Sequence, residues 1–550
     1  MNQPPTPVDM LLQWAIDRKD TPWLFQPLNG QWSSITWGEA ADQVRRMATA
    51  LQSLGLPPKS AIALSGRNCA HWFLADLAIA MAGYISVGLY PKQARSAVQY
   101  ILEHCEARAV FIGPMPDPED FDQALPEGII KIGMPYPNLG IDCQHQWTSL
   151  IAAHQPMAKP VDRAPEDLVT LVYTSGTTGN PKGVMINGRN MTFAAEGLQK
   201  AMPAQGQERF FSYLPLAHAF ERGAVEMSSL YFGAEVHFLE DIEKLPTQLA
   251  QVAPTRFFGV PLVLGRIQAG VLKKLPQKKL DTLLKLPIIS GLIKKKIKTG
   301  IGLQNVRYLI AGAAPVPIPL MEWFKKLDIE VLQGYGMTEN NIYATATLPG
   351  ANRLGSVGRA MPGAKMRIAS DGEIQFQHPA VMAGYYKDEE KTRETFTDDG
   401  WLRTGDRGKV DEQGYLFITG RVKDIFKTLK GKYVAPAPIE GAMGRNTLID
   451  QLCLVGTELK QPILLVSLND AGRAMSKAEA GAALVADMDA VNATLESHEQ
   501  IAKILVVRDL WTIDNGLMTP TMKVKRNEVE ARYKALLGQH AESREKLAWE

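Results

Sequence analysis

The stretch from residue 171 to residue 183 concentrates groups that bind phosphate. An apolar run, Leu171–Tyr173, is followed by hydroxyls, glycines and one lysine, Lys182. Glycines let a backbone curl around an oxyanion, and hydroxyls and exposed N–H groups donate hydrogen bonds to it. Lys182 can neutralise a phosphate as a point charge. The stretch does not fit the G-x-x-x-x-G-K-[ST] pattern, so its residue types leave open either another phosphate loop or a flexible turn.

Two carboxylates lie in turns of similar composition. Glu339 ends an aromatic, Gly-rich turn, Gln333–Glu339. A carboxylate beside a phosphate site suits Mg²⁺, which one or two carboxylates and substrate phosphates usually hold. Asp406 ends a Thr-Gly-Asp turn after Trp401, and an Asp can accept two hydrogen bonds from vicinal ribose hydroxyls. Taken alone, Glu339 also fits a surface acid and Asp406 a turn cap.

These stretches belong to a longer ordered set. Ser-Gly-Thr-Thr-Gly-x-Pro-Lys-Gly at 175–183 resembles the phosphate loop of the adenylate-forming (AMP-binding) superfamily, and the chain resembles its long-chain fatty acyl-coenzyme A synthetases. The resemblance covers roughly residues 35 to 535. Its further motifs are Tyr213–His218 with Glu221 and Arg222, Gly312–Pro315, Gln333–Glu339, Gly355–Gly358, Gly400–Asp406, Gly420–Asp424 and Thr519–Arg526. Chance does not produce such an ordered set.

The resemblance implies roles for individual residues. Thr338 would contact the α-phosphate, and Glu339 would bind the metal. His218 would line the site of the acyl carboxylate, although a packing role stays open. A general-base role is disfavoured because a carboxylic acid is already ionised at pH 7. The residues implied in ATP binding are Thr174, Ser175, Gly176, Thr177, Thr178, Gly179, Lys182, Gly312, Ala313, Gly334, Tyr335, Gly336, Asp406 and Arg421.

The catalytic lysine and the hinge lie toward the C-terminus. Most of the family reads Thr-x-Ser-Gly-Lys, and alignment on Thr521 places Lys525 at the catalytic position, with Lys523 as the alternative. A lysine there can neutralise charge that builds up during attack. Either residue also fits a solvated basic tail. Lys423 matches the hinge position about which the C-terminal domain turns.

The expected reaction is the ATP- and Mg²⁺-dependent activation of a fatty acid to an acyl-adenylate. Transfer to coenzyme A then gives acyl-CoA, AMP and pyrophosphate. Alternatives are transfer to a carrier-protein phosphopantetheine, a P-loop-type NTPase, and a non-catalytic membrane-associated scaffold. Val260–Arg266 departs from the family's Val-Pro-Arg-Val-Trp-Glu, which borders the acyl tunnel. The resemblance therefore does not indicate the length of the acyl chain. Asn340 and Asn341 stand where a small residue usually follows the glutamate, and we expect them to add hydrogen-bonding groups beside the site.

The elements that must position these residues alternate along the chain. Helical spacing over Glu39–Leu54 precedes a strand at Ala61–Leu64, and a helix over Ala97–His104 precedes a strand at Ala109–Gly113. Such alternation predicts a parallel sheet with crossover helices. Together with the resemblance, it predicts an α/β fold. We expect a large N-terminal domain (1–420) of αβαβα layers with a β-rich subdomain, and a small mobile α+β C-terminal domain (421–550).

Bulk composition excludes other classes. The 550 residues carry 60 basic and 58 acidic side chains, a net charge of +2, which argues against a nucleic-acid partner. The four cysteines form no C-x-x-C pair, so we expect neither a disulfide framework nor a thiolate zinc site. A protein of a reducing compartment fits this pattern. No signal-peptide pattern opens the chain. Leu77–Tyr90 is shorter than the roughly 20 residues of a membrane span, and it predicts a buried helix, Trp72–Met81, before a strand, Tyr84–Leu89.

One stretch departs from this neutral balance. Lys273–Lys298 holds nine lysines and one acid, Asp281. It fits a solvated pair of helices or a patch that lies on an anionic membrane. Pro276, Pro287 and Gly291 predict interruptions of any helix there. We therefore expect a cytoplasmic protein and leave open a peripheral position on the inner face of a membrane. No pattern indicates an oligomeric state.

Overall fold

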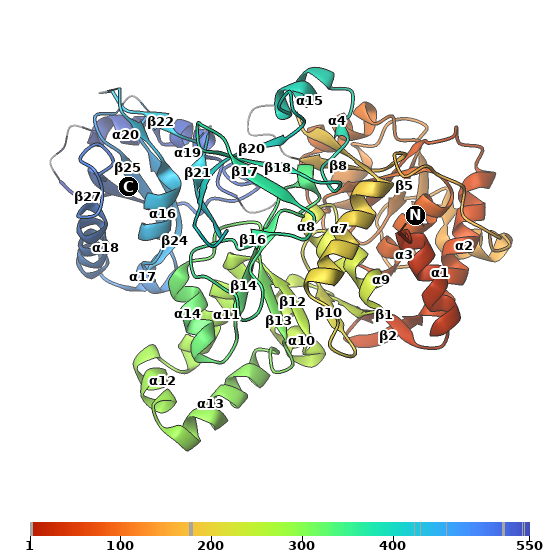
Figure 1. Ribbon diagram of the computed structural model, residues 1–550, viewed down its shortest axis with the longest axis horizontal. Coiled ribbons are helices and arrows are strands. Elements are labelled where there is room, and N and C mark those ends of the chain that lie inside the picture. Colours follow the sequence, from red (N-terminus) through yellow and green to blue (C-terminus); the bar gives the residue numbers. More distant parts are fainter. Residues whose placement is uncertain are drawn as a thin grey trace. The chain divides into compact units, whose positions relative to one another are not determined.

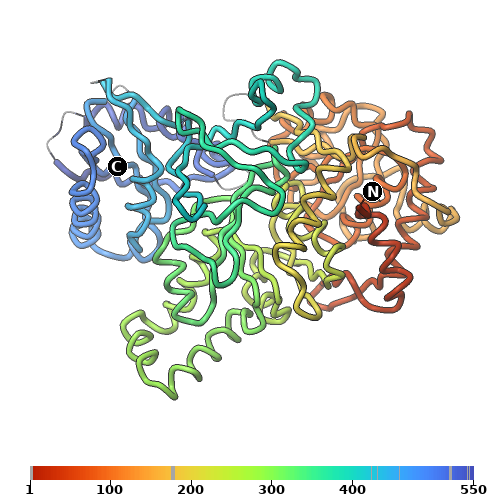
Figure 2. The backbone as a smooth tube through the Cα atoms, in the orientation of Figure 1, coloured from red at the N-terminus to blue at the C-terminus, as the bar shows by residue number. Residues whose placement is uncertain are grey.

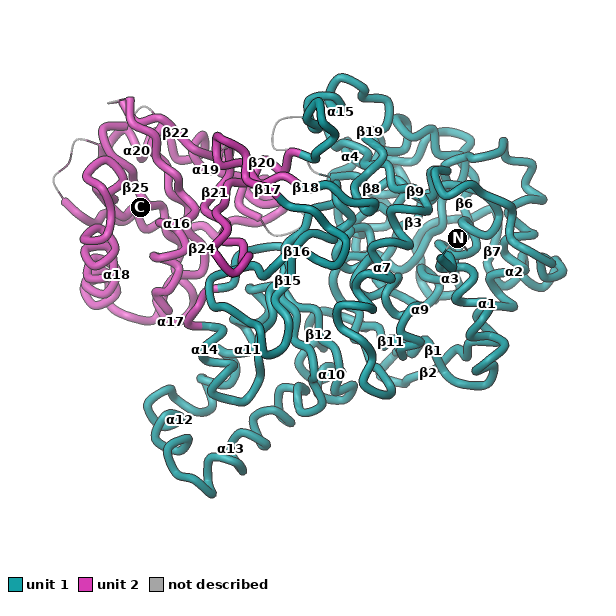
Figure 3. The backbone as a smooth tube through the Cα atoms, in the orientation of Figure 1, with its two compact units in different colours: residues 1–316, 320–366, 376–402 teal, residues 317–319, 367–375, 403–550 magenta. Residues whose placement is uncertain are grey.

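A computed structural model describes residues 4–174, 180–422, 424–429, 431–457, 459–519, 523–541, 543 and 545–550. The expectations for Ser175–Gly179 and Lys423 therefore concern residues outside the described ones. The chain divides into two compact units (Figure 3). Unit 1 comprises residues 1–316, 320–366 and 376–402, and unit 2 comprises residues 317–319, 367–375 and 403–550. The domain boundary at 420/421, with movement about it, stays a prediction.

Unit 1 contains a sheet that, among the described residues, has eight strands. β3 lies between β4 and β5, and these central pairings are parallel. β8 then pairs with β9 in antiparallel fashion, which turns the chain back at this edge of the sheet. In spatial order the strands are β19 (Gly384–Tyr385), β9 (Lys182–Asn187), β8 (Leu168–Thr174), β4 (Ile85–Leu89), β3 (Ala61–Ser65), β5 (Ala109–Ile112), β6 (Ile130–Gly133) and β7 (His145–Gln146).

A second sheet of unit 1 has nine strands within the described ranges. Its centre is parallel, and its two ends are antiparallel pairs, β14–β15–β16 and β1–β2. In spatial order the strands are β16 (Arg359–Ala360), β15 (Thr345–Ala346), β14 (Val331–Tyr335), β13 (Tyr308–Ala311), β12 (Arg256–Gly259), β10 (Arg209–Ser212), β11 (Glu235–Phe238), β1 (Pro22–Leu28) and β2 (Gln31–Thr36).

Helices fill the space between the sheets and cover their outer faces (Figure 1). Successive strand residues point to opposite faces: Ile62 packs into the central core, whereas Ala63 packs outward against the cluster containing Val98. The central core joins both sheets through α1 (Pro7–Asp17), α2 (Trp37–Ser53), α3 (Ala70–Met81), α7 (Gly188–Ala201) and α9 (Ser228–Phe232). The outer layers contain α4 (Arg95–His104) with α5 (Pro118–Asp122), and α10 (Leu245–Val252) with α11 (Pro261–Lys274) and α14 (Ile318–Lys326). The αβαβα prediction is confirmed.

A local signal explains where α2 begins. The sequence places α2 from Glu39, but the helix starts at Trp37 because Thr36 and Glu39 form a capping box, which satisfies otherwise orphaned N–H groups. The apolar stretch Leu77–Tyr90 contains the end of α3 and then β4, and both elements are almost wholly buried. None of the described helices combines the length and apolarity needed to cross a bilayer.

Unit 2 joins short β-ribbons to an α+β core. One sheet orders β17 (Lys365–Ile368), β18 (Glu373–Gln377), β20 (Leu402–Val410) and β21 (Leu416–Arg421). One end of each of β17, β18 and β20 belongs to unit 1. A second sheet, β24 (Ile449–Val455), β25 (Ile463–Leu468), β26 (Lys503–Val507) and β27 (Leu547–Trp549), packs against helices on both faces. These helices include α16 (Pro436–Met443), α18 (Lys477–Asn492), α19 (Arg526–Arg532) and α20 (Lys534–His540).

The lysine-rich stretch forms the end of α11, then α12 (Gln277–Leu284) and α13 (Pro287–Gly300). The breaks predicted at Pro276 and Pro287 are confirmed. The break predicted at Gly291 is wrong, because Gly291 lies inside α13. A glycine costs a helix only about 1 kcal/mol relative to alanine, and Ile293 and Ile297 hold this helix by packing on the core of unit 1.

Candidate active site

The two strands that flank the predicted phosphate loop face each other directly. Thr174 ends β8 and Lys182 begins β9, and the two are register partners. Ser175–Gly179 lie outside the described residues, so their implied contacts stay predictions. The strand pairing nevertheless fixes both ends of the segment, since β8 and β9 are hydrogen-bonded from Leu168 onward.

The predicted phosphate-binding lysine and the predicted metal ligand both contact one tyrosine, the lysine at its ring and the glutamate at its hydroxyl. Tyr385 Oη donates a hydrogen bond of 2.7 Å to Glu339 Oε1. Lys182 Nζ lies 5.5 Å from the centroid of the same tyrosine ring. β19, which carries Tyr385, pairs with β9, which Lys182 begins. Sequence reasoning missed Tyr385, because nothing in Gly384–Tyr385 signals chemistry.

The Tyr385 hydroxyl is a permanent donor in this arrangement. Its side chain is buried at 8% exposure, and burial, followed by the charge of Glu339, raises the pKa of the phenol. The backbone of Glu339 is held too, since its carbonyl accepts a 2.8 Å hydrogen bond from Met382 N. Glu339 is therefore oriented at both its main chain and one carboxylate oxygen.

The loop after Glu339 is tightly constrained. Asn340 Oδ1 accepts from Met337 N at 2.9 Å, and Asn341 Nδ2 donates to Asn190 O at 3.2 Å. Both amides were expected to offer groups to the site, but these bonds go to backbone and hold the loop. Asn341 and Ile342 adopt positive φ angles of 51° and 58°, which is unusual for a β-branched residue. A Cβ on Gly336 would lie 2.5 Å from the backbone of Ile342, so this position requires glycine.

The predicted adenine-contacting motifs meet at the carboxyl ends of adjacent strands. β13 and β14 are parallel, with Ala311 opposite Gln333, so Gly312 and Gly334 follow side by side. A Cβ on Gly312 would lie 3.2 Å from Gly334 O and 3.5 Å from the Phe220 ring. Ligands of open α/β sheets bind at this edge. Ala313 has a positive φ of 64°, and Tyr335 ends β14.

His218 lies next to that edge as the N-cap of α8 (Ala219–Glu221). Its Nδ1 accepts a 3.1 Å hydrogen bond from Phe220 N, and the ring of Phe220 abuts Gly312. Because Nδ1 accepts, the proton of the neutral ring resides on Nε2. Nε2 is then a donor, as recognition of a carboxylate requires. The structure thus gives His218 a capping role that the sequence did not indicate, and its contact with an acyl carboxylate stays a prediction.

A buried ionic network supports the segment after His218. Arg222 NH2 donates to both carboxylate oxygens of Asp76 at 2.6 Å, and both residues are almost fully buried. Glu221 accepts from Ser212 Oγ at 2.7 Å and from Tyr213 N at 3.0 Å. Burial raises the pKa of Glu221 to about 8. The Glu-Arg pair of the motif is thus a structural anchor beneath the site.

In unit 2, Asp406 and Arg421 are brought together. They are register partners in β20 and β21, and Arg421 Nε donates to Asp406 Oδ1 at 3.1 Å. Thr404 Oγ1 accepts from Asp406 N at 3.1 Å. These residues lie inside β20, so the turn predicted at Thr-Gly-Asp is wrong. Gly405 needs its positive φ of 71° there. The cation beside the carboxylate suits a ribose-phosphate group, whose hydroxyls and charge the two side chains could share.

The predicted catalytic lysine immediately precedes α19. Lys525 is its N-cap, and Lys525 N donates to Leu517 O at 2.9 Å. The next residue, Arg526, forms a two-pronged pair with Glu440 at 2.6 and 2.9 Å. This pair raises the pKa of Arg526 against the opposing effect of burial. Arg526 thus holds the motif to α16. Lys523 is exposed and Lys525 half-buried, and which of the two is the catalytic lysine stays a prediction.

The residues present fit magnesium. No cluster of three or more His, Cys, Asp or Glu side chains that could hold a metal occurs among the described residues. Mg²⁺ needs none, because one or two carboxylates and substrate phosphates suffice. Glu339 supplies a carboxylate whose orientation Tyr385 sets, and substrate phosphates would supply further oxygens. This hard-oxygen donor set suits magnesium bound together with a nucleotide.

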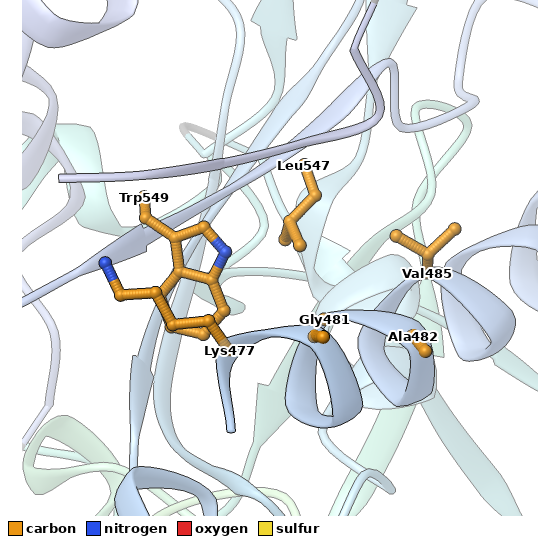
Figure 4. A pocket seen from close by; sticks show the side chains of 7 residues that line it. Lys477, Gly481, Ala482, Val485, Leu547 and Trp549 are labelled. Atoms are coloured by element: carbon orange, nitrogen blue, oxygen red, sulfur yellow. The ribbon is translucent and has the colours of Figure 1, made fainter. Parts of the chain in front are cut away.

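An apolar cleft of about 480 Å³ lies elsewhere, between α18 and β27 of unit 2 (Figure 4). Lys477 Nζ lies 5.3 Å from the centroid of the Trp549 ring, and Leu547 and Val485 line the remainder. The lining contains no residue of the motifs above. The cleft therefore takes no part in the site.

Comparison with known proteins identifies the family. The family model described as "AMP-binding enzyme" matches residues 12–386, and "AMP-binding enzyme C-terminal domain" matches residues 423–544. The chain belongs to the AMP-binding enzyme family. The family resemblance found in the motifs is thereby confirmed.

Relatives in this family match along almost the whole chain. The long-chain-fatty-acid–CoA ligase FadD15 of Mycobacterium bovis is 30% identical, covering 92% of each chain. Long chain acyl-CoA synthetase 6, peroxisomal, of Arabidopsis thaliana is 29% identical over 91% of this chain and 80% of that protein. The anthranilate CoA ligase AuaEII, solved with anthranoyl-AMP, has the same fold, with a TM-score of 0.82, 20% identity and coverage of 98% and 99%.

Proposed function

We propose that the protein is a fatty acid–coenzyme A ligase that works through an acyl-adenylate. The observation that carries this proposal is the grouping of Lys182, Tyr385 and Glu339 in unit 1. It offers a cation for phosphate and an oriented carboxylate for a phosphate-bound magnesium ion. The substrate class is supported by the relatives, which are named long-chain-fatty-acid ligases and match over nine-tenths of the chain.

In the first step, a carboxylate oxygen of the fatty acid forms a bond to the α-phosphorus of ATP. The bond from that phosphorus to the bridging oxygen breaks, and pyrophosphate leaves with the electron pair. Lys182 and the segment from Thr174 to Thr178 hold the β- and γ-phosphates, and Thr338 contacts the α-phosphate. His218 donates from Nε2 to the acyl carboxylate. When bound at Glu339, Mg²⁺ would neutralise phosphate charge.

Lys525 offsets the charge that develops on the bridging and carboxylate oxygens in this step. Preorganised charge of this kind is among the largest contributions to catalysis. Holding acid and nucleotide in line adds the advantage of a unimolecular reaction. Asp406 holds the ribose hydroxyls, with Arg421 beside it. The adenine lies along the edge formed by Gly312, Ala313 and the Gly334–Gly336 turn.

In the second step, the thiol of coenzyme A loses its proton to solvent and its sulfur forms a bond to the acyl carbon. The bond from that carbon to the phosphate oxygen breaks, and AMP leaves with the electron pair. The small domain turns about Lys423 between the steps, which withdraws Lys525 and admits the thiol. Lys525 therefore serves only the first step, with Lys523 as the alternative residue.

The test is pyrophosphate release across carboxylic acids from acetate to oleate, with and without coenzyme A. We expect release that depends on a fatty acid, and acyl-CoA as the product when coenzyme A is present. Release of inorganic phosphate without any acid would instead indicate an NTPase. Acyl transfer to a carrier protein but not to free coenzyme A would show that the acceptor is the carrier protein. The proposed first step would then stand unchanged.

A further inference from the structure

The helices α12 and α13, with the turn between them, form a hairpin over residues 277–300 that the proposed reaction does not use. The hairpin extends outward from the rest of unit 1 (Figures 1 and 2). Its inner contacts are few but definite: Leu280 is buried, and Ile293 and Ile297 pack on the adjacent core. Leu284 packs on the same core, whereas residues 285–289 are exposed.

The outward face of α13 begins with exposed apolar side chains. Ile288 is 84% exposed and Leu292 is 66% exposed. They stand four residues apart, so they form one stripe on the helix, opposite to Ile297. Leu286 and Ile289, 43% and 41% exposed, flank them. Four large aliphatic side chains gathered in seven residues are a patch rather than scattered surface residues, and such patches mark interaction sites.

Lysines surround this patch. Lys295 and Lys296 continue the stripe one turn beyond Leu292, and Lys285 precedes it in the turn; all three are exposed. Asp281, the one acid among residues 273–298, is paired at 2.8 Å with Lys326, which lies outside the hairpin. Lys294 pairs with Asp328 at 2.7 Å. The exposed lysines therefore dominate the charge around the apolar tip.

We propose that this tip docks on the surface of an anionic lipid bilayer. Ile288 and Leu292 enter the boundary between headgroups and acyl chains, and the neighbouring lysines contact lipid phosphates. Exposed aliphatic side chains next to lysines suit a membrane surface, because the apolar groups bury at the boundary of headgroups and acyl chains and the lysines are attracted to anionic lipids. A nucleic acid would match the lysines but not the aliphatic tip, and an apolar protein surface would match the tip but not the lysines. Docking at this tip requires no spanning helix.

Vesicle flotation tests the proposal. The full chain is mixed with vesicles of phosphatidylcholine alone or of phosphatidylcholine with phosphatidylglycerol, at low and high salt. We expect flotation with the anionic vesicles that weakens as salt rises, since salt screens exposed charges. Each lysine near an anionic surface contributes about 1 kcal/mol, so Lys295→Glu with Lys296→Glu should lower partitioning about thirtyfold or more.

Matched variants distinguish binding through this tip from nonspecific electrostatic or hydrophobic binding elsewhere on the protein. Ile288→Asp with Leu292→Asp should abolish flotation, whereas Ile16→Asp, at a position 78% exposed on α1, should not. Lys409→Glu with Lys534→Glu changes net charge equally at two other exposed lysines and should reduce binding much less. Thermal melting and fatty-acid-dependent pyrophosphate release confirm that each variant is folded.

Three outcomes would overturn the proposal. The first is the absence of flotation with anionic vesicles. The second is equal flotation with both vesicle types at all salt concentrations. The third is an equal loss in the control variants and in the hairpin variants.

Discussion

The contact between Tyr385 and Glu339 gives the sharpest test of the site. Tyr385→Phe removes one oxygen atom and leaves the ring on which Lys182 rests. The lost hydrogen bond is 2.7 Å long, comes from a buried side chain and ends on a carboxylate. Hydrogen bonds to charged groups contribute about 1.5–3 kcal/mol. We therefore expect adenylation to slow by about 10- to 150-fold at fixed magnesium.

The assay is ATP–pyrophosphate exchange at varied Mg²⁺ concentration. If Tyr385 acts by orienting the metal-binding carboxylate, the variant should need more Mg²⁺ and recover partly when it is supplied. Tyr386→Phe is the matched control, because Tyr386 packs on the opposite face of the strand, with its ring 5.7 Å from His104. That control should retain activity close to that of the original protein.

A double-mutant cycle supplies the refuting result. Glu339→Gln removes the charged acceptor, so adding Tyr385→Phe to it should cost little more. If the two losses multiply instead, Tyr385 does not act through Glu339, and the reasoning fails. Unchanged exchange in Tyr385→Phe alone would refute it as well.

Three further predictions concern separate parts of the protein. Lys525→Ala should abolish ATP–pyrophosphate exchange yet still form thioester from supplied acyl-adenylate; normal exchange in Lys525→Ala, with loss in Lys523→Ala, would reverse the assignment. His218→Ala should raise the KM for fatty acid about tenfold, as expected for one lost hydrogen bond to a charge, with a smaller effect on the KM for ATP; equal changes in both would contradict a carboxylate contact. Glu221 has its pKa raised from 4.5 to about 8 by burial, so its stabilising contribution is full below pH 4.5 and is lost as pH rises through about 8. The Tm of the original protein should therefore fall relative to that of Glu221→Gln between pH 5 and pH 8, and parallel curves would show that Glu221 does not titrate in that window.

The structure also explains a motif whose parts have different roles. In Lys-x-Lys-Arg, Arg526 binds both carboxylate oxygens of Glu440. This ion pair joins α19 to α16. The same division applies near His218, where Arg222 is bound to Asp76. Arg222 and Asp76 are 6% and 5% exposed, and removing one partner of such a buried pair costs about 3–5 kcal/mol because the other charge stays buried without a partner. Substitutions at either arginine would thus act on stability before they act on chemistry.

The sequence by itself determined the family and most of the residues proposed to bind the nucleotide. Phosphate, ribose and adenine groups are bound by short consecutive strings, such as the segment ending at Lys182 and the turn ending at Glu339. Their backbone shape is local, because glycines and strand ends set it. The alternation of helix and strand likewise fixed the layered α/β fold, because periodicity reports which faces must be buried.

Only the tertiary structure decided which distant residues complete the site. Tyr385 reaches Glu339 across 46 positions because β19 adds to the edge of β9, and no local pattern specifies that pairing. Arg222 and Asp76 are 146 positions apart, and Arg526 and Glu440 are 86 apart. The first contact follows from sheet order, and the buried Arg222–Asp76 pair follows from the need of a buried charge for a partner. The exposed stripe on α13 also depends on tertiary packing, because Ile293 and Ile297 pack on the core of unit 1 and Ile288 does not.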